Sequence, residues 1–137
     1  MRTLHFGLRV ADLERSLAFY TAVGYEVVGE VPETGLGHLT MLKLPGDEFV
    51  TIELVHNPSG PAVEGNRLSH FVIQVDSMDA AVAALNARGI DVETPTSPDG
   101  SPDFLTAHLT DPDGSDIELV QWPAGHAAGM SAADWES

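Results

Sequence analysis

The stretch FVTIELVHN at residues 49–57 has its central letters, IELV, repeated in GSDIELVQW at residues 114–122. Both stretches have the apolar, β-branched composition of a buried strand. Each carries a glutamate between Ile and Leu: Glu53 in the first and Glu118 in the second. A carboxylate inside an apolar strand costs free energy unless it is paired or bound. The same feature in two matching strands suggests a repeated unit and a partner that both glutamates share.

The repeat extends over nearly the whole chain. A gapless overlay that places 4–28 over 69–93 also aligns the two IELV segments. In this overlay His5 lies over His70, and the spacing from His5 to Glu53 equals that from His70 to Glu118. Self-similarity of this kind predicts one supersecondary unit used twice within a single domain. The expected parts are a first module at about 3–57, a Gly- and Pro-rich linker at 58–67, a second module at about 68–121, and a tail at 122–137 that is either loose or a docking arm.

Each module is expected to have the element order βαβββ. Asp12 and Ser77 are suitable helix N-caps, and Gly24 and Gly89 stand where a helix C-cap takes a positive φ. The fold class predicted from this order is α+β, with tandem βαβββ modules. The expected strands span about 3–10, 25–31, 37–44 and 49–56 in the first module, and about 68–75, 90–93, 104–110 and 115–121 in the second.

Composition excludes several classes of function. The 137 residues include 21 acidic and 6 basic side chains, a formal net charge of −15, which argues against nucleic acid or an anionic membrane surface as a partner. The chain has no cysteine, so thiolate metal sites and disulfides are excluded. No apolar run has the length of a membrane span or the character of a signal peptide. We expect a soluble cytoplasmic protein.

The direction of the side chains suggests what the glutamates bind. Alternate residues of a strand share a face, so His5 and Glu53 are expected to point away from the helix-covered face of their sheet, and His70 and Glu118 from theirs. Two imidazoles and two carboxylates suit a divalent ion such as Ni, Co, Zn, Mn or Fe. The ion would supply the positive charge that the carboxylates require. The alternative is a structural His–Glu pair that duplication copied.

Arg9 breaks the symmetry of the repeat, because its counterpart is Gln74. A cation on the expected cleft face of one module either holds an anionic group of a substrate or forms a salt bridge within the sheet. The remaining histidines have no counterpart in the repeat and are expected to be incidental. They are His38, His56, His108 and His126.

These residues resemble the vicinal oxygen chelate superfamily, and within it glyoxalase I (lactoylglutathione lyase). The resemblance covers about residues 1–121 and is carried by MRTLHFGLRVADLERSLAFY, TIELVHN, LSHFVIQV and DPDGSDIEL. It implies a single metal bound by four ligands. The residues that match the family's ligands are His5, Glu53, His70 and Glu118. The compact length, without long insertions, resembles the bacterial form and implies nickel or cobalt rather than zinc.

The resemblance also implies a small-molecule substrate. Arg9 and Asn57 match positions that hold the γ-glutamyl end of glutathione. The family usually places a Lys or Arg before the seventh strand to hold the glycyl carboxylate, whereas here the loop TPTSPDGSPDF at 94–104 has no base and two aspartates. We therefore expect a thiol cosubstrate, and glutathione less readily than a thiol without that carboxylate.

The implied reaction isomerises the hemithioacetal of a 2-oxoaldehyde, such as methylglyoxal, to a 2-hydroxyacyl thioester. Glu118 is expected to be the main base, with Glu53 as its counterpart, while both also bind the metal. The resemblance implies a homodimer whose sites take His5 and Glu53 from one chain and His70 and Glu118 from the other. Two alternatives remain: a dioxygenase or thiol transferase on the same scaffold, and a non-catalytic protein that binds a drug or metabolite.

Overall fold

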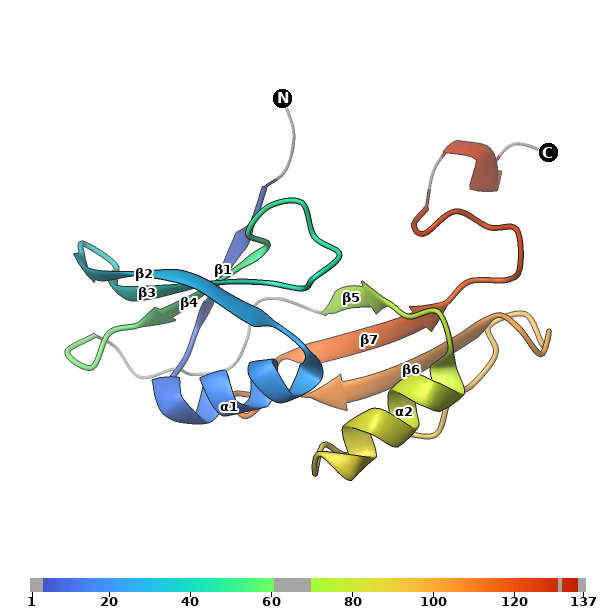
Figure 1. Ribbon diagram of the computed structural model, residues 1–137, viewed down its shortest axis with the longest axis horizontal. Helices are drawn as coiled ribbons and strands as arrows, with labels where there is room; N and C mark the ends of the chain where they lie inside the picture. Colours follow the sequence, from blue (N-terminus) through green and yellow to red (C-terminus); the bar gives the residue numbers. More distant parts are fainter. Residues whose placement is uncertain (1–3, 61–69, 131, 136–137) are drawn as a thin grey trace. The chain divides into compact units, whose positions relative to one another are not determined.

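The computed structural model of the chain describes residues 4–60, 70–130 and 132–135 (Figure 1). These residues form two compact units. The first contains residues 4–60 together with the turn at 111–114, and the second contains the remaining described residues from 70 onward. The expected linker at 58–67 lies mostly outside the described residues.

The first unit contains one mixed sheet and one helix. Its strands lie in the order β1-β4-β3-β2; β1 is parallel to β4, and the other neighbours are antiparallel. The elements are β1 (Phe6–Arg9), α1 (Leu13–Val23), β2 (Glu26–Thr34), β3 (Gly37–Lys43) and β4 (Ile52–His56). This is the predicted βαβββ order.

Helix α1 begins and ends at the predicted residues. The Asp12 carboxylate accepts a hydrogen bond of 3.1 Å from the Arg15 backbone N–H, so it caps the first turn. At the other end, Gly24 has φ 131°, a conformation that a side chain disfavours. Tyr20 is fully buried and packs edge-on against Phe19 and Tyr25.

One face of the first sheet is buried, and the other is half-buried along its central strands β3 and β4. The buried side chains occupy alternate positions on the paired strands, as a period of two requires. Phe6 shares this face by alternation with Leu8 but is 36% exposed, because it begins the edge strand β1. The buried side chains of this face on the paired strands are Leu8, Thr40, Leu42, Ile52 and Leu54.

The second unit has a smaller sheet in the order β5-β7-β6, with β5 parallel to β7 and β6 antiparallel to it. Ser77 caps its helix through a 3.2 Å bond from the Ala80 N–H. No helix among the described residues is long and apolar enough to cross a membrane. The elements are β5 (Phe71–Gln74), α2 (Met78–Ala87), β6 (Leu105–Thr110), β7 (Asp116–Gln121) and the 3₁₀ helix η1 (Ala132–Trp135).

The strand predicted at 90–93 is wrong. The segment that follows α2 makes only separate backbone hydrogen bonds to β6: Glu93 N–H donates to the His108 carbonyl, and Thr96 and Thr106 exchange two bonds, all of 2.9 Å. Pro95 lies between the two contacts and has no N–H to donate, so the ladder is interrupted. The α+β class holds, but the second unit has three strands.

The gapless overlay of the two modules is also wrong within the last hairpin. It places Thr106 over Met41, which is the register partner of Glu53 in the first unit. In the second unit the register partner of Glu118 is instead His108. The connection from β3 to β4 is longer than that from β6 to β7, so a gap was needed there.

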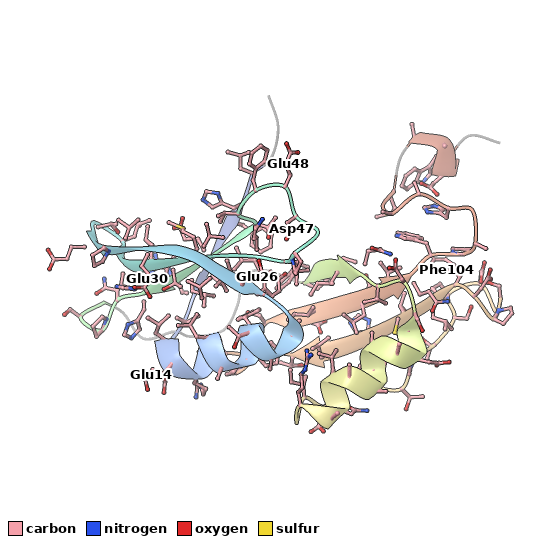
Figure 2. The ribbon with its side chains drawn as sticks, in the orientation of Figure 1. Glu14, Glu26, Glu30, Asp47, Glu48 and Phe104 are labelled. Carbon is pink, nitrogen blue, oxygen red and sulfur yellow. The ribbon has the colours of Figure 1, made fainter. Side chains whose placement is uncertain are left out.

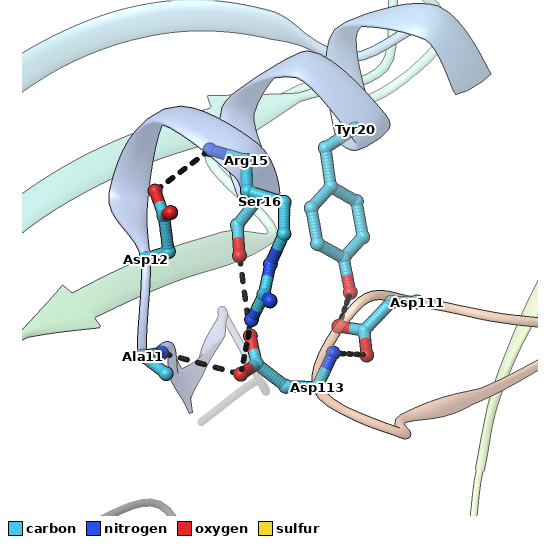
Figure 3. A network of polar contacts seen from close by, with 7 residues as sticks. All are labelled: Ala11, Asp12, Arg15, Ser16, Tyr20, Asp111 and Asp113. Carbon is cyan, nitrogen blue, oxygen red and sulfur yellow. Dashed lines mark hydrogen bonds and ion pairs between the residues drawn. The ribbon is translucent and has the colours of Figure 1, made fainter.

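The turn between β6 and β7 belongs to the first unit (Figure 3). The Tyr20 hydroxyl donates a 2.7 Å hydrogen bond to the buried Asp111 carboxylate. Asp113 accepts bonds of 3.2 Å from the Ser16 hydroxyl and from the Ala11 N–H. Burial and then Asp111 raise the pKa of Tyr20 well above its ordinary value, so its hydroxyl remains a donor.

The start of the tail is anchored to the second unit by an aromatic stack. The Trp122 ring stacks on Phe104 at 5.4 Å and on His126 at 4.4 Å (Figure 2 labels Phe104). Its indole N–H donates to the Ala128 carbonyl at 3.0 Å. His126 also contacts the Asp134 carboxylate in η1. Stacking on Phe104 therefore attaches Trp122 to the second unit, and the remaining contacts hold the described tail residues to one another, with η1 exposed.

Candidate functional site

The first unit brings together one predicted His–Glu pair. His5 directly precedes β1, and Glu53 lies on β4 as the register partner of Gly7, two residues after His5. Gly7 adds no side chain between them, and His5 Nε2 lies 3.2 Å from Glu53 Oε2. The histidine side chain is 40% exposed, whereas that of Glu53 is only 12% exposed. Parallel pairing thus joins two groups that lie at opposite ends of the module's sequence.

The spacing of this pair is compatible with metal ligation. Two donors bound at right angles to one ion at about 2.1 Å would lie about 3 Å apart. The His5–Glu53 distance is close to that value. Neutral imidazole nitrogen and carboxylate oxygen are also the donor types that first-row divalent ions accept. The residues present in the first unit therefore fit half of an N/O metal site.

The second unit repeats the same register. Glu118 on β7 is the partner of Val72 on β5, and His70 stands two residues before Val72, as His5 does before Gly7. Glu118 is 25% exposed. Because the parallel register is the same in both units, His70 and Glu118 occupy the places that His5 and Glu53 occupy in theirs.

Sequence reasoning missed one neighbour of Glu118. His108, expected to be incidental, lies directly opposite Glu118 on β6, with Nε2 3.8 Å from Glu118 Oε1. Its Nδ1 lies 3.5 Å from Asp116 Oδ2. Counting outward from the turn of the last hairpin would have found this pair, because Thr110 and Asp116 are register partners and the next partners on that face are His108 and Glu118.

The donors come as pairs within each unit. Within the described part of the chain, no three His, Asp or Glu side chains are grouped so that they could hold a metal ion. One His–Glu pair provides two ligands, fewer than the four or more that a first-row divalent ion usually takes from protein and water. A four-ligand site would therefore need both pairs.

Arg9 and Asn57 lie at the same end of the neighbouring strands β1 and β4. Arg9 is the register partner of Val55, and Asn57 follows two residues after Val55. Arg9 is exposed and makes no ion pair with another described residue, so the intrasheet salt bridge is not formed there. Asn57 Oδ1 accepts a 3.2 Å bond from the Ser59 N–H, which fixes the turn.

Both aspartates of the 94–104 loop are used to hold structure. Asp99 accepts bonds from the Ser101 hydroxyl at 2.6 Å, the Ser101 N–H at 2.9 Å and the Ser97 hydroxyl at 3.1 Å. The Ser101 bonds lower the pKa of Asp99, which keeps it ionised. Asp103 Oδ2 accepts from the Ala124 N–H at 3.3 Å. The loop therefore presents negative charge.

Comparisons with known proteins support the assignment of this fold and family. Residues 2–119 match the family described as the Glyoxalase/Bleomycin resistance protein/Dioxygenase superfamily. The chain is 34% identical over 125 residues to the lactoylglutathione lyase of Salmonella typhimurium, covering 88% of this chain and 93% of that protein. It is 35% identical over 130 residues to the probable lactoylglutathione lyase of Vibrio cholerae, covering 92% and 94%.

A solved structure points to a different activity on the same fold. An antibiotic-binding protein from Streptomyces sp. CB03234 superposes with a TM-score of 0.69 at 27% identity, covering 88% of this chain and 96% of that one. The fold therefore serves both lyases and binding proteins among the relatives. The length of the family match and the identity to the lyases nevertheless settle membership: the chain belongs to the glyoxalase/bleomycin resistance protein/dioxygenase superfamily.

Proposed function

We propose that the chain is a metal-dependent, glyoxalase I-like lyase that converts the hemithioacetal of a 2-oxoaldehyde and a thiol to a 2-hydroxyacyl thioester. The observation that carries the proposal is the repeated register: in each unit a histidine stands two residues before the strand partner of a glutamate. Relatives that are named lactoylglutathione lyase support the reaction class.

The proposed ligands are His5 and Glu53 of the first unit with His70 and Glu118 of the second. Nickel or cobalt is favoured over zinc by the resemblance to the compact bacterial enzymes. When bound, the ion would act as a Lewis acid toward the substrate oxygens. It would stabilise the negative charge that forms when the neighbouring C–H bond loses its proton. The histidines hold their places as neutral donors and move no proton.

Glu118 is the proposed general base. Its carboxylate takes the proton from C1 of the hemithioacetal and returns a proton to C2, while the hydroxyl proton moves from the oxygen on C1 to the oxygen on C2. The step is an isomerisation: one C–H bond breaks and another forms, with no oxidant or reductant. Glu53 is the proposed counterpart for the opposite face of the substrate.

Arg9 and Asn57 are the proposed contacts for the thiol. The exposed guanidinium of Arg9 offers a planar pair of donors for a carboxylate, and Asn57 offers an amide that suits a peptide-like group. The 94–104 loop offers Asp99 and Asp103 instead of a cation. We therefore propose a thiol whose far end lacks a carboxylate as the better cosubstrate.

We also propose that the working form is a homodimer. Each unit supplies a single His–Glu pair, and a four-ligand site would combine His5 and Glu53 of one chain with His70 and Glu118 of its partner. Exposed apolar side chains on β2 provide surface that association could cover. They are Val27, Val28 and Val31.

A second candidate is a binding protein without turnover. The similarity to an antibiotic-binding protein favours it. Such a protein would need an apolar pocket and no metal. The experiment that separates the two combines metal analysis with an assay of methylglyoxal and several thiols, following thioester formation by ultraviolet absorbance.

The lyase is supported if the protein turns over an adduct, loses turnover on chelation and regains it with Ni²⁺ or Co²⁺. Consumption of O₂ with iron would instead indicate a dioxygenase, and conjugation without isomerisation would indicate a thiol transferase. Purified protein that holds no metal and acts on no adduct would leave the binding protein as the better account.

A further inference from the structure

Glu118 and Glu53 have different partners across the neighbouring antiparallel strand. His108 on β6 lies opposite Glu118, whereas Met41 on β3 lies opposite Glu53. The two glutamates are otherwise placed alike by the parallel pairing of β7 with β5 and of β4 with β1. The polar neighbour therefore distinguishes the second unit from the first.

His108 stands between two carboxylates. Its Nε2 lies 3.8 Å from Glu118 Oε1, and its Nδ1 lies 3.5 Å from Asp116 Oδ2. Asp116 and Glu118 are two residues apart on β7, so both point to the same face as His108. All three side chains are partly exposed, at 41%, 44% and 25% for His108, Asp116 and Glu118. The imidazole ring is therefore placed with one nitrogen toward each carboxylate, and Nε2 is the nitrogen that faces Glu118.

We infer that His108 is a positioning residue for Glu118, which it would orient for metal binding and proton transfer through an Nε2–H donor. The inference rests on the proposed function, because it needs Glu118 to be a ligand and base. The Met41 side chain has no N–H or O–H to donate, so no side chain on β3 directly opposite Glu53 can orient its carboxylate by a hydrogen bond. The two carboxylates would then differ in function although the repeat makes them equivalent in position.

The physical reason is the freedom of a glutamate side chain. A carboxylate on three rotatable bonds can present either oxygen, and each ordered torsion costs conformational entropy on binding. A hydrogen bond to one carboxylate oxygen restricts the orientations that the other oxygen can take. Neighbours that hold a metal ligand in this way typically account for about 10- to 100-fold in metal affinity. His108 would give Glu118 this support.

The test measures metal affinity of the metal-free protein by titration calorimetry with Ni²⁺, separately from turnover. His108→Leu removes the donor, and His108→Gln keeps an N–H at nearly the same reach. Met41→Leu is the matched control, since Met41 has the corresponding place opposite Glu53. His108→Thr repeats the removal with a residue that strands favour, in case the leucine variant folds poorly. Circular dichroism verifies the fold of each.

We expect His108→Leu and His108→Thr to weaken Ni²⁺ binding by about 10- to 100-fold. His108→Gln should recover most of that loss, and Met41→Leu should stay within about twofold of the wild type. If the wild type binds Ni²⁺ and both His108→Leu and His108→Thr bind it equally tightly, the inference about His108 is wrong, while the proposed function still stands. A wild type that binds no divalent metal would overturn the proposed function, and this inference with it.

Discussion

Glu53 pairs across the sheet with Gly7, which lies two positions after His5. Glu118 pairs in the same way with Val72, which lies two positions after His70. The relationship arises because the first and last strands of each unit pair in parallel. In the first unit it already brings His5 Nε2 to 3.2 Å from Glu53 Oε2. A buried or half-buried carboxylate is retained at low cost when it has such a partner.

The choice of thiol should follow the charge of the 94–104 loop. We predict that the glutathione adduct is turned over about tenfold less efficiently than the adduct of a thiol without the terminal carboxylate, because Asp99 and Asp103 repel that group. Steady-state kcat/KM for the two adducts is the measurement. Asp103→Lys should raise kcat/KM for the glutathione adduct, while the charge-neutral control Asp103→Asn should raise it less. Efficient wild-type turnover of that adduct, with no gain in the lysine variant, would contradict this account.

Assembly is a separate prediction. Sedimentation at micromolar concentration should give the mass of two chains, because association would cover the exposed apolar side chains of β2. Val28→Asp places a charge where Val28 is 54% exposed and should shift the equilibrium toward the monomer and lower metal occupancy. Glu26→Gln on the same strand is the control. A monomer that binds metal at full strength would rule the dimer out.

The bond between Tyr20 and Asp111 should stabilise the first unit. Tyr20→Phe removes a buried donor from a carboxylate 2.7 Å away, and we expect it to lower the free energy of unfolding by about 1–3 kcal/mol. Urea unfolding followed by circular dichroism measures the change. Tyr25→Phe is the control, since the Tyr25 hydroxyl makes no hydrogen bond to another described residue, and it should cost less. Equal losses would show that the hydroxyl bond adds nothing.

The contacts within the C-terminal tail should depend on pH through His126. The Ala127 carbonyl, and then Asp134, raise the pKa of His126 above its ordinary value of 6.5. A raised pKa means that this stabilisation is fully present below pH 6.5 and is lost as the pH rises through the higher folded value. Trp122, which stacks on His126, should change its fluorescence over that range in a Trp135→Phe background. The same change in a protein that also carries His126→Gln would exclude His126 as its cause.

Much of the fold could be predicted from the sequence because the repeat supplies each assignment twice. Asp12 and Ser77 cap their helices as expected. The first and last strands of each unit lie within the ranges that were expected for them. The strand at 90–93 was wrong because a short segment ending at Pro95 cannot continue a ladder. Local propensity indicates an extended segment but does not decide whether its neighbours complete the pairing.

The candidate site could be predicted in part. The His–Glu spacing identified His5 and Glu53, whose contact follows from the parallel pairing of β1 and β4. His108 was missed because it has no histidine counterpart in the repeat: the residue in the same cross-strand place of the first unit is Met41. Which residue faces a strand neighbour depends on register, and in a hairpin the type and length of the turn fix the register.

Metal content of the purified protein and its single-ligand variants tests the central claim most directly. Elemental analysis after purification in the presence of Ni²⁺ should give one divalent ion per His₂Glu₂ set in the wild type. His5→Ala, His70→Ala and Glu118→Ala should each lower occupancy sharply, because each removes one of four donors, while His38→Ala should not. Full occupancy and turnover in all three ligand variants would contradict the account.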